Sequence, residues 1–309
     1  MSRASSLRVA LLAAVAALFA SLLIAVPSTA GAVAPDPSND HPWLPKRCVA
    51  GPGEYVPDKP GPCYLTPYRK NRPTVVLWGD SHAWQHLPAV EPLARNRKVN
   101  LVLFMLGGCP PILVGEHFKG TMYACEKSNQ LALRFVRKLK KNDKQVRVLL
   151  GAFWDGYYKV YRGVYVTGTM DPAPFTTTQL RSARTFHRLT PKLIATLGED
   201  RIRVDLIGQA ASVPANPPNC SRGEDPYDCD LRRPVALPRE KRWNDWFRRM
   251  QHGLPDGSRV VRFSHTYCGK TKCHGFTDGM HTFFDPTHLS KSRTSTFRKF
   301  FAPTFRGFN

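Results

Sequence analysis

The sequence predicts one α/β domain in three layers, with helices covering both faces of a five-stranded parallel sheet. Short, almost continuously apolar runs alternate along the chain with longer segments of helical spacing, which is typical of βαβ units. The chain of 309 residues contains no internal repeat and no low-complexity tract. Its composition, 42% hydrophobic and 22% charged, is that of a globular protein.

The first half of the alternation supplies three strands and two helices. TVVLWG (74–79), NLVLFML (100–106) and VRVLLGA (146–152) are apolar enough for strands that are buried on both faces. The segment 83–96 has helical spacing despite two prolines, and 125–141 is a clear amphipathic helix.

The second half continues the same rhythm. A long helical segment (176–198) precedes the strand IRVDLIG (202–208), and a further helix (238–253) precedes the strand RVVRFS (259–264). A last helix is expected over 289–302. Parallel sheets of this kind bind ligands outside the carboxyl ends of their strands, where the strand order reverses. The loops after the strands are therefore the expected functional edge.

The segments before the alternation differ from the domain at 73–309. Residues 1–34 combine a basic start, an apolar run and small residues, which predicts a signal peptide cleaved between Ala30 and Ala34; an uncleaved anchor is the alternative. Residues 35–72 are rich in Pro, Gly and Lys and predict a loop-like lead-in. We therefore expect a secreted or cell-envelope protein.

The cysteines fit an exported protein, because their even number favours disulfides in an oxidising compartment. Zinc is the alternative near His265, Cys268, Cys273, His274 and His281, but the Cys-x4-Cys spacing is loose for a zinc site. No metal or other cofactor is expected. Sequential pairing is the simplest arrangement, in the order Cys48, Cys63, Cys109, Cys125, Cys220, Cys229, Cys268 and Cys273.

The formal net charge of +22 attracts anionic partners. The sequence has no nucleic-acid recognition motif, and an exported protein rarely meets nucleic acid. Anionic wall polymers or lipid head groups fit the compartment better. A generally basic, solvated surface without a single partner is the alternative.

Two short blocks carry the candidate chemistry. Gly79-Asp80-Ser81 follows the first strand, either as a helix-capping turn or as a turn that presents Ser81 as a nucleophile. Near the carboxyl end, Asp285 and His288 stand three residues apart, a spacing at which a carboxylate can orient an imidazole toward a serine. In the local alternative, Asp285 only caps a helix that begins near His288.

These blocks resemble the SGNH (GDSL-type) hydrolases, and are most similar to the extracytoplasmic SGNH domains of acyltransferase-3 type envelope O-acetyltransferases. The similarity covers Gly-Asp-Ser-His, the final Asp-x-x-His-Leu-Ser, Gly-Cys-Pro-Pro at 108–111, Trp-x-x-Tyr at 154–157 and Cys-x4-Cys at 268–273. It spans roughly residues 72 to 302 and implies a flavodoxin-like SGNH hydrolase fold.

The resemblance also implies roles for individual residues. Ser81 would be the nucleophile, His288 the general base and acid, and Asp285 its orienting carboxylate. The backbone N–H groups of Ser81 and Gly108 would be oxyanion donors. The wider family has an asparagine donor after the third strand, which GAFWDGYY lacks. Ionised Asp155 cannot donate, so we expect Trp154 to donate its indole N–H or Tyr157 to line the site, with simple packing of both aromatic rings as the alternative.

The sequence therefore predicts a secreted serine esterase that removes O-acyl, chiefly O-acetyl, groups from cell-envelope polysaccharide or peptidoglycan. The first alternative is an O-acyltransferase that works with a separate membrane acyl-supplying partner. The second is a non-catalytic glycan-binding protein that retains the fold.

Overall fold

The computed structural model describes residues 39–49, 57, 59–114, 123–142, 144–157, 177–212 and 230–308. The predicted signal peptide (1–34) and the predicted Cys220–Cys229 pair lie outside these residues. None of the described helices is both long and apolar enough to cross a membrane.

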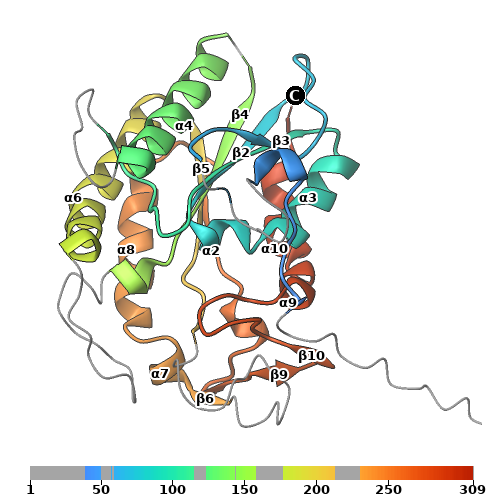
Figure 1. Cartoon of the computed structure of the whole chain (residues 1–309), viewed down its shortest axis with the longest axis vertical. Helices are drawn as coiled ribbons and strands as arrows, with labels where there is room; N and C mark the ends of the chain where they lie inside the picture. Colours follow the sequence, from blue (N-terminus) through green and yellow to red (C-terminus); the bar gives the residue numbers. More distant parts are fainter. Residues whose placement is uncertain are drawn as a thin grey trace, which may run out of the picture. The chain divides into compact units, whose positions relative to one another are not determined.

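A six-stranded sheet forms the centre of the domain, with helices on both faces (Figure 1). Its order is β1-β3-β2-β4-β5-β7, and all neighbouring pairs are parallel except β1 with β3. The five predicted strands are therefore confirmed as parallel neighbours. The strands are β1 (Cys63–Tyr64), β2 (Thr74–Gly79), β3 (Asn100–Met105), β4 (Val146–Gly151), β5 (Arg203–Ile207) and β7 (Arg259–Val261).

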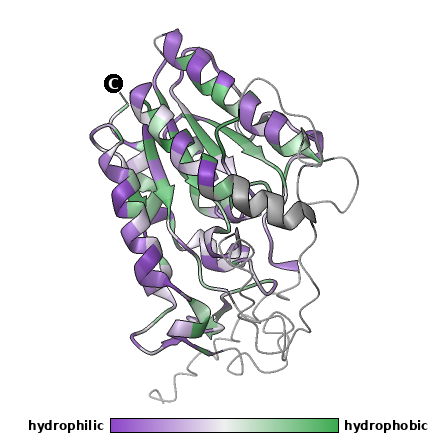
Figure 2. Ribbon diagram, turned by 90° about the vertical axis from the view of Figure 1, so that its left-hand side faces the viewer, coloured by the Kyte–Doolittle hydropathy of each residue, from purple (hydrophilic) through white to green (hydrophobic). Residues whose placement is uncertain are grey.

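The helices divide between the two faces of the sheet. Residues of α4, α6 and α8 pack on one face, where Val76 and Trp78 of β2 are buried, and residues of α2, α3 and α10 pack on the other, where Val75 and Leu77 are buried. Figure 2 shows the apolar strands enclosed by helices with hydrophilic outer surfaces. The helices are α2 (Ser81–Trp84), α3 (Leu87–Asn96), α4 (Tyr123–Lys141), α6 (Thr177–Glu199), α7 (Arg233–Ala236), α8 (Glu240–His252), α9 (Lys291–Ser295) and α10 (Arg298–Phe301).

Two predicted helices are shorter than the sequence pattern suggests. The segment 83–96 is split into α2 and α3, because the ring of Pro88 near the start of α3 prevents a continuous helix through the preceding turn. The segment 289–302 contains α9 and α10, followed by the 3₁₀ turn η4 (Ala302–Phe305). Other 3₁₀ turns are η2 (Lys46–Cys48) and η3 (Ser264–Thr266).

Four two-residue strands form small antiparallel pairs that the sequence did not predict. They are β6 (Leu231–Arg232) with β8 (Lys272–Cys273), and β9 (Phe276–Thr277) with β10 (Met280–His281). Asp278 and Gly279, with positive φ angles of 55° and 72°, form the tight turn of the second pair.

The described part of the lead-in packs on the domain. Cys48 is bonded to Cys63 of β1, which joins the edge of the sheet. The carbonyl oxygen of Asp40 accepts a hydrogen bond from the N–H of Lys291, and its carboxylate accepts from that of Ser292. The lead-in thus contributes to the same compact unit as the sheet.

The order in which successive strands join the sheet reverses between the parallel neighbours β2 and β4. From β2 the chain first crosses to β3 on one side, and later to β4 on the other. The loops after β2 and β4 diverge at this point, which is where parallel α/β sheets bind ligands. Ser81 follows β2, at this edge.

Candidate active site

The turn that carries Ser81 depends on a close approach between β2 and β4. A Cβ atom on Gly79 would lie 1.7 Å from the carbonyl oxygen of Gly151, so no larger residue fits at the end of β2. Asp80 then caps α2, since its Oδ1 accepts a hydrogen bond of 2.7 Å from the N–H of His82. The capping turn and the presentation of Ser81 are therefore two properties of one structure.

The second block forms a tight loop between β10 and α9. Phe283 and Leu289 pair across it as an isolated bridge, and the N–H of Phe284 donates to the carbonyl oxygen of His288 at 3.1 Å. The side chain of Gln85, just after α2, accepts a hydrogen bond of 2.8 Å from the N–H of Leu289. This contact joins the loop to the element that carries Ser81.

Ser81, His288 and Asp285 form one chain of short contacts. His288 Nε2 lies 2.7 Å from Ser81 Oγ, and His288 Nδ1 lies 2.7 Å from Asp285 Oδ2. Burial alone would raise the pKa of Asp285, but the hydrogen bond and charge of His288 and two backbone N–H groups outweigh it and lower the pKa. Asp285 is thus an ionised acceptor at neutral pH, which favours the proton of a neutral ring on Nδ1 and leaves Nε2 to accept from Ser81.

Asp285 does not cap a helix. Its Oδ1 accepts hydrogen bonds from the N–H groups of Thr287 and His288, which closes the turn of the loop. The next helix, α9, begins only at Lys291, and Ser290 is its cap. The local alternative for this carboxylate therefore does not hold.

Aromatic rings surround His288. The ring of Phe284 stacks on it at 5.5 Å, and the ring of His82 lies at 4.6 Å and itself stacks on Phe153 at 4.4 Å. Burial, followed by the charges of His288 and His86, lowers the pKa of His82 well below its usual value. His82 is consequently a neutral neighbour that adds no positive charge beside His288.

Asp80 connects the ends of β2 and β4 below the candidate nucleophile. Its Oδ2 accepts hydrogen bonds from the hydroxyl of Tyr157 at 2.7 Å and from the N–H of Phe153 at 2.9 Å. Burial raises the pKa of Asp80, although these hydrogen bonds act in the opposite direction. Burial and the neighbouring carboxylate raise the pKa of Tyr157 well above its usual value. Tyr157 is therefore a buried support of Asp80, and its hydroxyl does not line an open site.

The structure does not support Trp154 as an oxyanion donor. Its side chain is fully buried, and its indole N–H donates to the carbonyl oxygen of Ile207 at 2.9 Å. The indole therefore has no N–H to offer an oxyanion, and the packing alternative describes it. Asp155 is also buried and forms an ion pair of 2.8 Å with Arg239.

Gly108 lies in the loop after β3, at the same edge of the sheet as Ser81. Its φ angle of +64° is in the left-handed region that favours glycine. Within the part of the chain that the structure describes, no hydrogen-bond acceptor is assigned to its N–H. The backbone at Gly108 is thus exposed, in a conformation that glycine adopts readily.

Asn129 of α4 holds this loop and is absent from the sequence prediction. Its Oδ1 accepts hydrogen bonds from Trp78 Nε1 at 2.8 Å and from the N–H of Ile112 at 3.0 Å. Its Nδ2 donates to the carbonyl oxygens of Pro110 and Cys125, each at 3.0 Å. Because its partners come from β2 and from a loop without regular structure, no periodic pattern marks this residue.

Disulfides connect three of the four predicted pairs: Cys48–Cys63, Cys109–Cys125 and Cys268–Cys273. Cys109–Cys125 ties the loop of Gly108 to α4. Cys268–Cys273 takes both thiols away from the proposed zinc alternative, and among the described residues no group of three or more His, Cys, Asp or Glu side chains is arranged for a metal ion.

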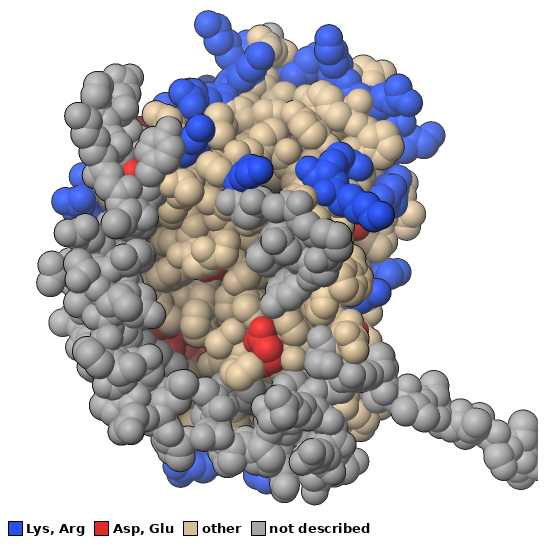
Figure 3. Space-filling model, in the orientation of Figure 1, with Lys and Arg blue, Asp and Glu red and all other residues tan. Residues whose placement is uncertain are grey.

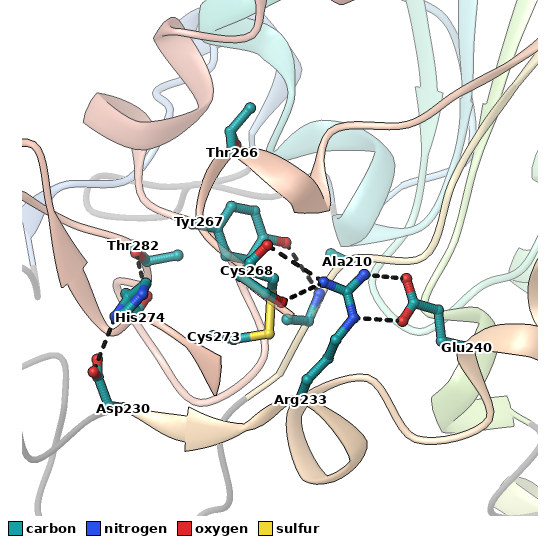
Figure 4. The surroundings of a disulfide bond; sticks show 12 residues. Ala210, Asp230, Arg233, Glu240, Thr266, Tyr267, Cys268, Cys273, His274 and Thr282 are labelled. Atoms are coloured by element: carbon teal, nitrogen blue, oxygen red, sulfur yellow. Dashed lines mark hydrogen bonds and ion pairs between the residues drawn. A yellow bond between two sulfur atoms is a disulfide. The ribbon is translucent and has the colours of Figure 1, made fainter. Parts of the chain in front are cut away.

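Figure 4 shows the surroundings of Cys268–Cys273. Arg233 forms an ion pair of 2.5 Å with Glu240 and donates to the carbonyl oxygens of Cys268 and Gly269, and the ring of His274 contacts Asp230 at 2.9 Å. The zinc candidate His274 thus has a carboxylate partner, Asp230, and the neighbouring Arg233 has Glu240. This region braces the segment that leads to β9, β10 and the loop of His288.

Comparison with known proteins identifies the family of the chain. The family model for the SGNH domain fused to AT3 domains matches residues 47–303. The periplasmic domain of a Salmonella ser. Paratyphi A lipopolysaccharide acetyltransferase is similar, with 14% identity and a TM-score of 0.46 over 77% of this chain and 85% of that chain. The curated proteins gave no significant match. On the family model, which spans most of its length, the chain belongs to the family of SGNH domains fused to AT3 domains.

Proposed function

We propose that the chain is an exported serine enzyme that accepts an acyl group from an O-acyl ester on Ser81. The contact of 2.7 Å between Ser81 Oγ and His288 Nε2, across 207 residues of sequence, carries this proposal. Membership of the SGNH family supports an acyl-transfer or esterase role in general.

The proposed reaction proceeds in two halves. Ser81 Oγ attacks the ester carbonyl while its proton moves to His288 Nε2, and the resulting imidazolium faces ionised Asp285. The C–O bond to the leaving alcohol then breaks, and Nε2 returns the proton to the alcohol oxygen. Water or a second alcohol then gives its proton to His288 Nε2 and attacks the acyl carbonyl. The bond between the acyl carbon and Ser81 Oγ breaks, Nε2 returns the proton to Oγ, and the acyl group leaves on the acceptor oxygen.

Backbone N–H groups would stabilise the tetrahedral intermediate. The N–H of Ser81 is at the first position of α2, where a helix has no internal acceptor for it, and that of Gly108 lies at the same edge. The helix has only four residues, so the local N–H group matters more than a summed helix dipole. Such a donor typically lowers the barrier by about 2.7–4 kcal/mol.

The proposed substrates are O-acetyl esters of envelope polysaccharide or peptidoglycan, with water as the acyl acceptor. The three disulfides support an oxidising compartment outside the cytoplasm, in agreement with the signal peptide inferred at residues 1–34. The net charge of +22 suits acidic envelope material. No cofactor is required for this chemistry.

The second candidate function is O-acyl transfer to a glycan hydroxyl, with acyl groups supplied by a membrane acyltransferase partner. The family description favours it, because the related SGNH domains are fused to AT3 domains. The acyl-Ser81 intermediate is common to both functions, and only the acceptor differs.

Removal of the nucleophile tests the common step. The purified protein is incubated with a chromogenic acetyl ester, and we expect Ser81→Ala to lower kcat at least about a thousandfold. Ser295→Ala, a change at another partly exposed serine on α9, should leave kcat unchanged. Mass spectrometry after treatment with a fluorophosphonate should find the label on Ser81. Equal rates of product release by the wild type and Ser81→Ala would reject the assignment.

The acceptor is tested separately with the active protein. Acetylated xylan or peptidoglycan fragments are supplied together with unmodified fragments, and the products are analysed by mass spectrometry. Release of free acetate without newly acetylated fragments supports the esterase. Acetylated acceptor fragments that depend on Ser81 support the transferase.

A further inference from the structure

A basic cavity lies at the edge of the sheet opposite the candidate active site. The loops that lead into the parallel strands meet there, beside the end of α4, and Figure 3 shows Lys and Arg side chains gathered at this end of the molecule (top). The cavity has a volume of about 470 Å³. Its charged lining residues are Lys140, Lys144, Arg147, Arg201, Arg203 and Asp256.

The arginine side chains at the floor of the cavity outnumber the carboxylates that pair with them. Arg203 and Arg259 both face Asp205, with Nε–O distances of 3.7 and 3.3 Å, and Asp205 is buried. Among the described residues, the guanidinium of Arg147 donates to the uncharged carbonyl oxygens of Pro303, Thr304, Arg306 and Gly307. Burial and then the charge of Arg203 lower the pKa of Arg147 to about 10. Three guanidinium groups (Arg147, Arg203 and Arg259) thus share one buried carboxylate, Asp205, and the cluster carries an excess of positive charge.

The deep cations are held in place before any ligand arrives. Arg147 is fixed by carbonyl oxygens of η4 and of the segment after it, and lies against the ring of Phe308 at 3.9 Å. The guanidinium of Arg203 lies against Gly257, where a Cβ atom would be 3.4 Å from Nη1. Lys140, Lys144 and Arg201 are exposed at the rim. Fixed cations on the floor and exposed cations at the rim suit a polyanion that presents several negative charges along its length.

We infer that this cavity binds phosphate groups of a phosphodiester polymer of the cell envelope. Five Lys and Arg side chains line the cavity against one carboxylate, which suits a polymer with several phosphates better than a single monoanion, and the volume admits a phosphodiester with its flanking units. Arg147 is 9% exposed, so a flat bilayer surface cannot reach it, whereas a flexible chain can insert a phosphate. The interaction would hold the enzyme on an anionic polymer while the opposite edge remains free for an acyl substrate.

Charge reversal at the rim tests this site in the full chain. The test variant is Lys140→Glu/Lys144→Glu/Arg201→Glu, and the control, Arg134→Glu/Arg232→Glu/Lys270→Glu, changes the net charge equally at exposed residues that do not line the cavity. Binding of a fluorescein-labelled oligo(glycerol phosphate) is followed by anisotropy. We expect the rim variant to bind at least about tenfold more weakly than wild type, and the control to stay within about twofold.

Three outcomes overturn the inference. Equal loss of binding in both variants would indicate diffuse attraction by the net charge, and equal affinity of the wild type for an oligogalacturonate would remove the preference for phosphate. Tighter, rim-dependent binding to phosphatidylglycerol vesicles than to the oligomer would identify a bilayer surface instead. Thermal melting confirms that both variants are folded. Since the readout is binding, the result does not depend on the proposed reaction of Ser81.

Discussion

At the scale of single residues, the polar atoms of the aromatic side chains near Ser81 point into the protein, where they bond to buried acceptors. Tyr157 and Trp154 follow β4 at the expected edge, but their polar atoms bond to Asp80 and Ile207. The sequence predicts that both aromatic residues follow the third parallel strand, but it cannot predict the direction in which their polar atoms point. The acceptor for Trp154 lies on β5, 53 residues away, so only the packed sheet determines where its N–H points.

Tyr157→Phe separates a supporting role from a substrate-binding role. Loss of a hydrogen bond to the buried carboxyl group of Asp80 should lower the free energy of unfolding by about 1–3 kcal/mol, measured by urea denaturation. The KM for a soluble acetyl ester should stay within about threefold of the wild type. Tyr68→Phe is the control, since within the described residues its hydroxyl makes no hydrogen bond. Unchanged stability with a large rise in KM would contradict the supporting role.

The Asp285–His288 pair was predictable because it is local. The two residues are three apart, and the same short loop also supplies the two backbone N–H groups that donate hydrogen bonds to Asp285. Ser81 was predictable from the position of a strand end. Asp80, Gln85 and Asn129 contribute through contacts between distant segments, which no spacing in the sequence reveals.

At the scale of secondary-structure elements, the long elements were predicted and the short ones were not. Each of the five parallel strands is an apolar run, and the amphipathic helices α4, α6 and α8 lie close to their predicted bounds. The two-residue strands β6, β8, β9 and β10 are too short to show any alternation. Their pairing is set by the loops between them and by the Cys268–Cys273 bridge.

Asn129→Leu tests how α4 supports the loop of Gly108. The substitution leaves the buried N–H groups of Trp78 and Ile112 without their acceptor, so the free energy of unfolding should fall by about 3 kcal/mol. The rate of ester cleavage per folded molecule should also fall, because the loop loses its attachment to the helix. Both quantities are measured on the same preparation by urea denaturation and a chromogenic assay.

The exposed Asn142→Leu, at the end of α4, is the matched control and should change the free energy of unfolding by less than about 0.5 kcal/mol. A destabilised Asn129→Leu with unaltered kcat and KM would show that the position of this loop is irrelevant to the reaction.

At the scale of the whole molecule, two buried histidines make folding sensitive to acid. His86 is fully buried among aromatic rings, and burial lowers its pKa to about 3; the pKa of His82 shifts in the same direction. Between the usual pKa of 6.5 and about 3, the unfolded chain binds a proton at His86 that the folded chain does not bind. The free energy of unfolding therefore decreases as the pH falls through this window.

His86→Leu should reduce this dependence. Between pH 6.5 and 4.5 the wild type should lose about 2 kcal/mol more of its unfolding free energy than the variant, as urea denaturation at both pH values would show. Burial raises the pKa of Asp80, which has the opposite sign, but this contribution is common to both proteins. The exposed His252→Leu is the control and should follow the wild type. Parallel pH curves for His86→Leu and the wild type would refute the prediction.

The separation of Ser81 and His288 along the chain also has a consequence during biosynthesis. A polypeptide that crosses a membrane amino end first delivers the serine early and the imidazole near the end of its passage. Until the final loop docks beside Gln85, the proposed nucleophile would have no imidazole beside it. In the proposed exported enzyme, reactivity would thereby be postponed until translocation is nearly complete, and esters on the side where the chain is made would be spared.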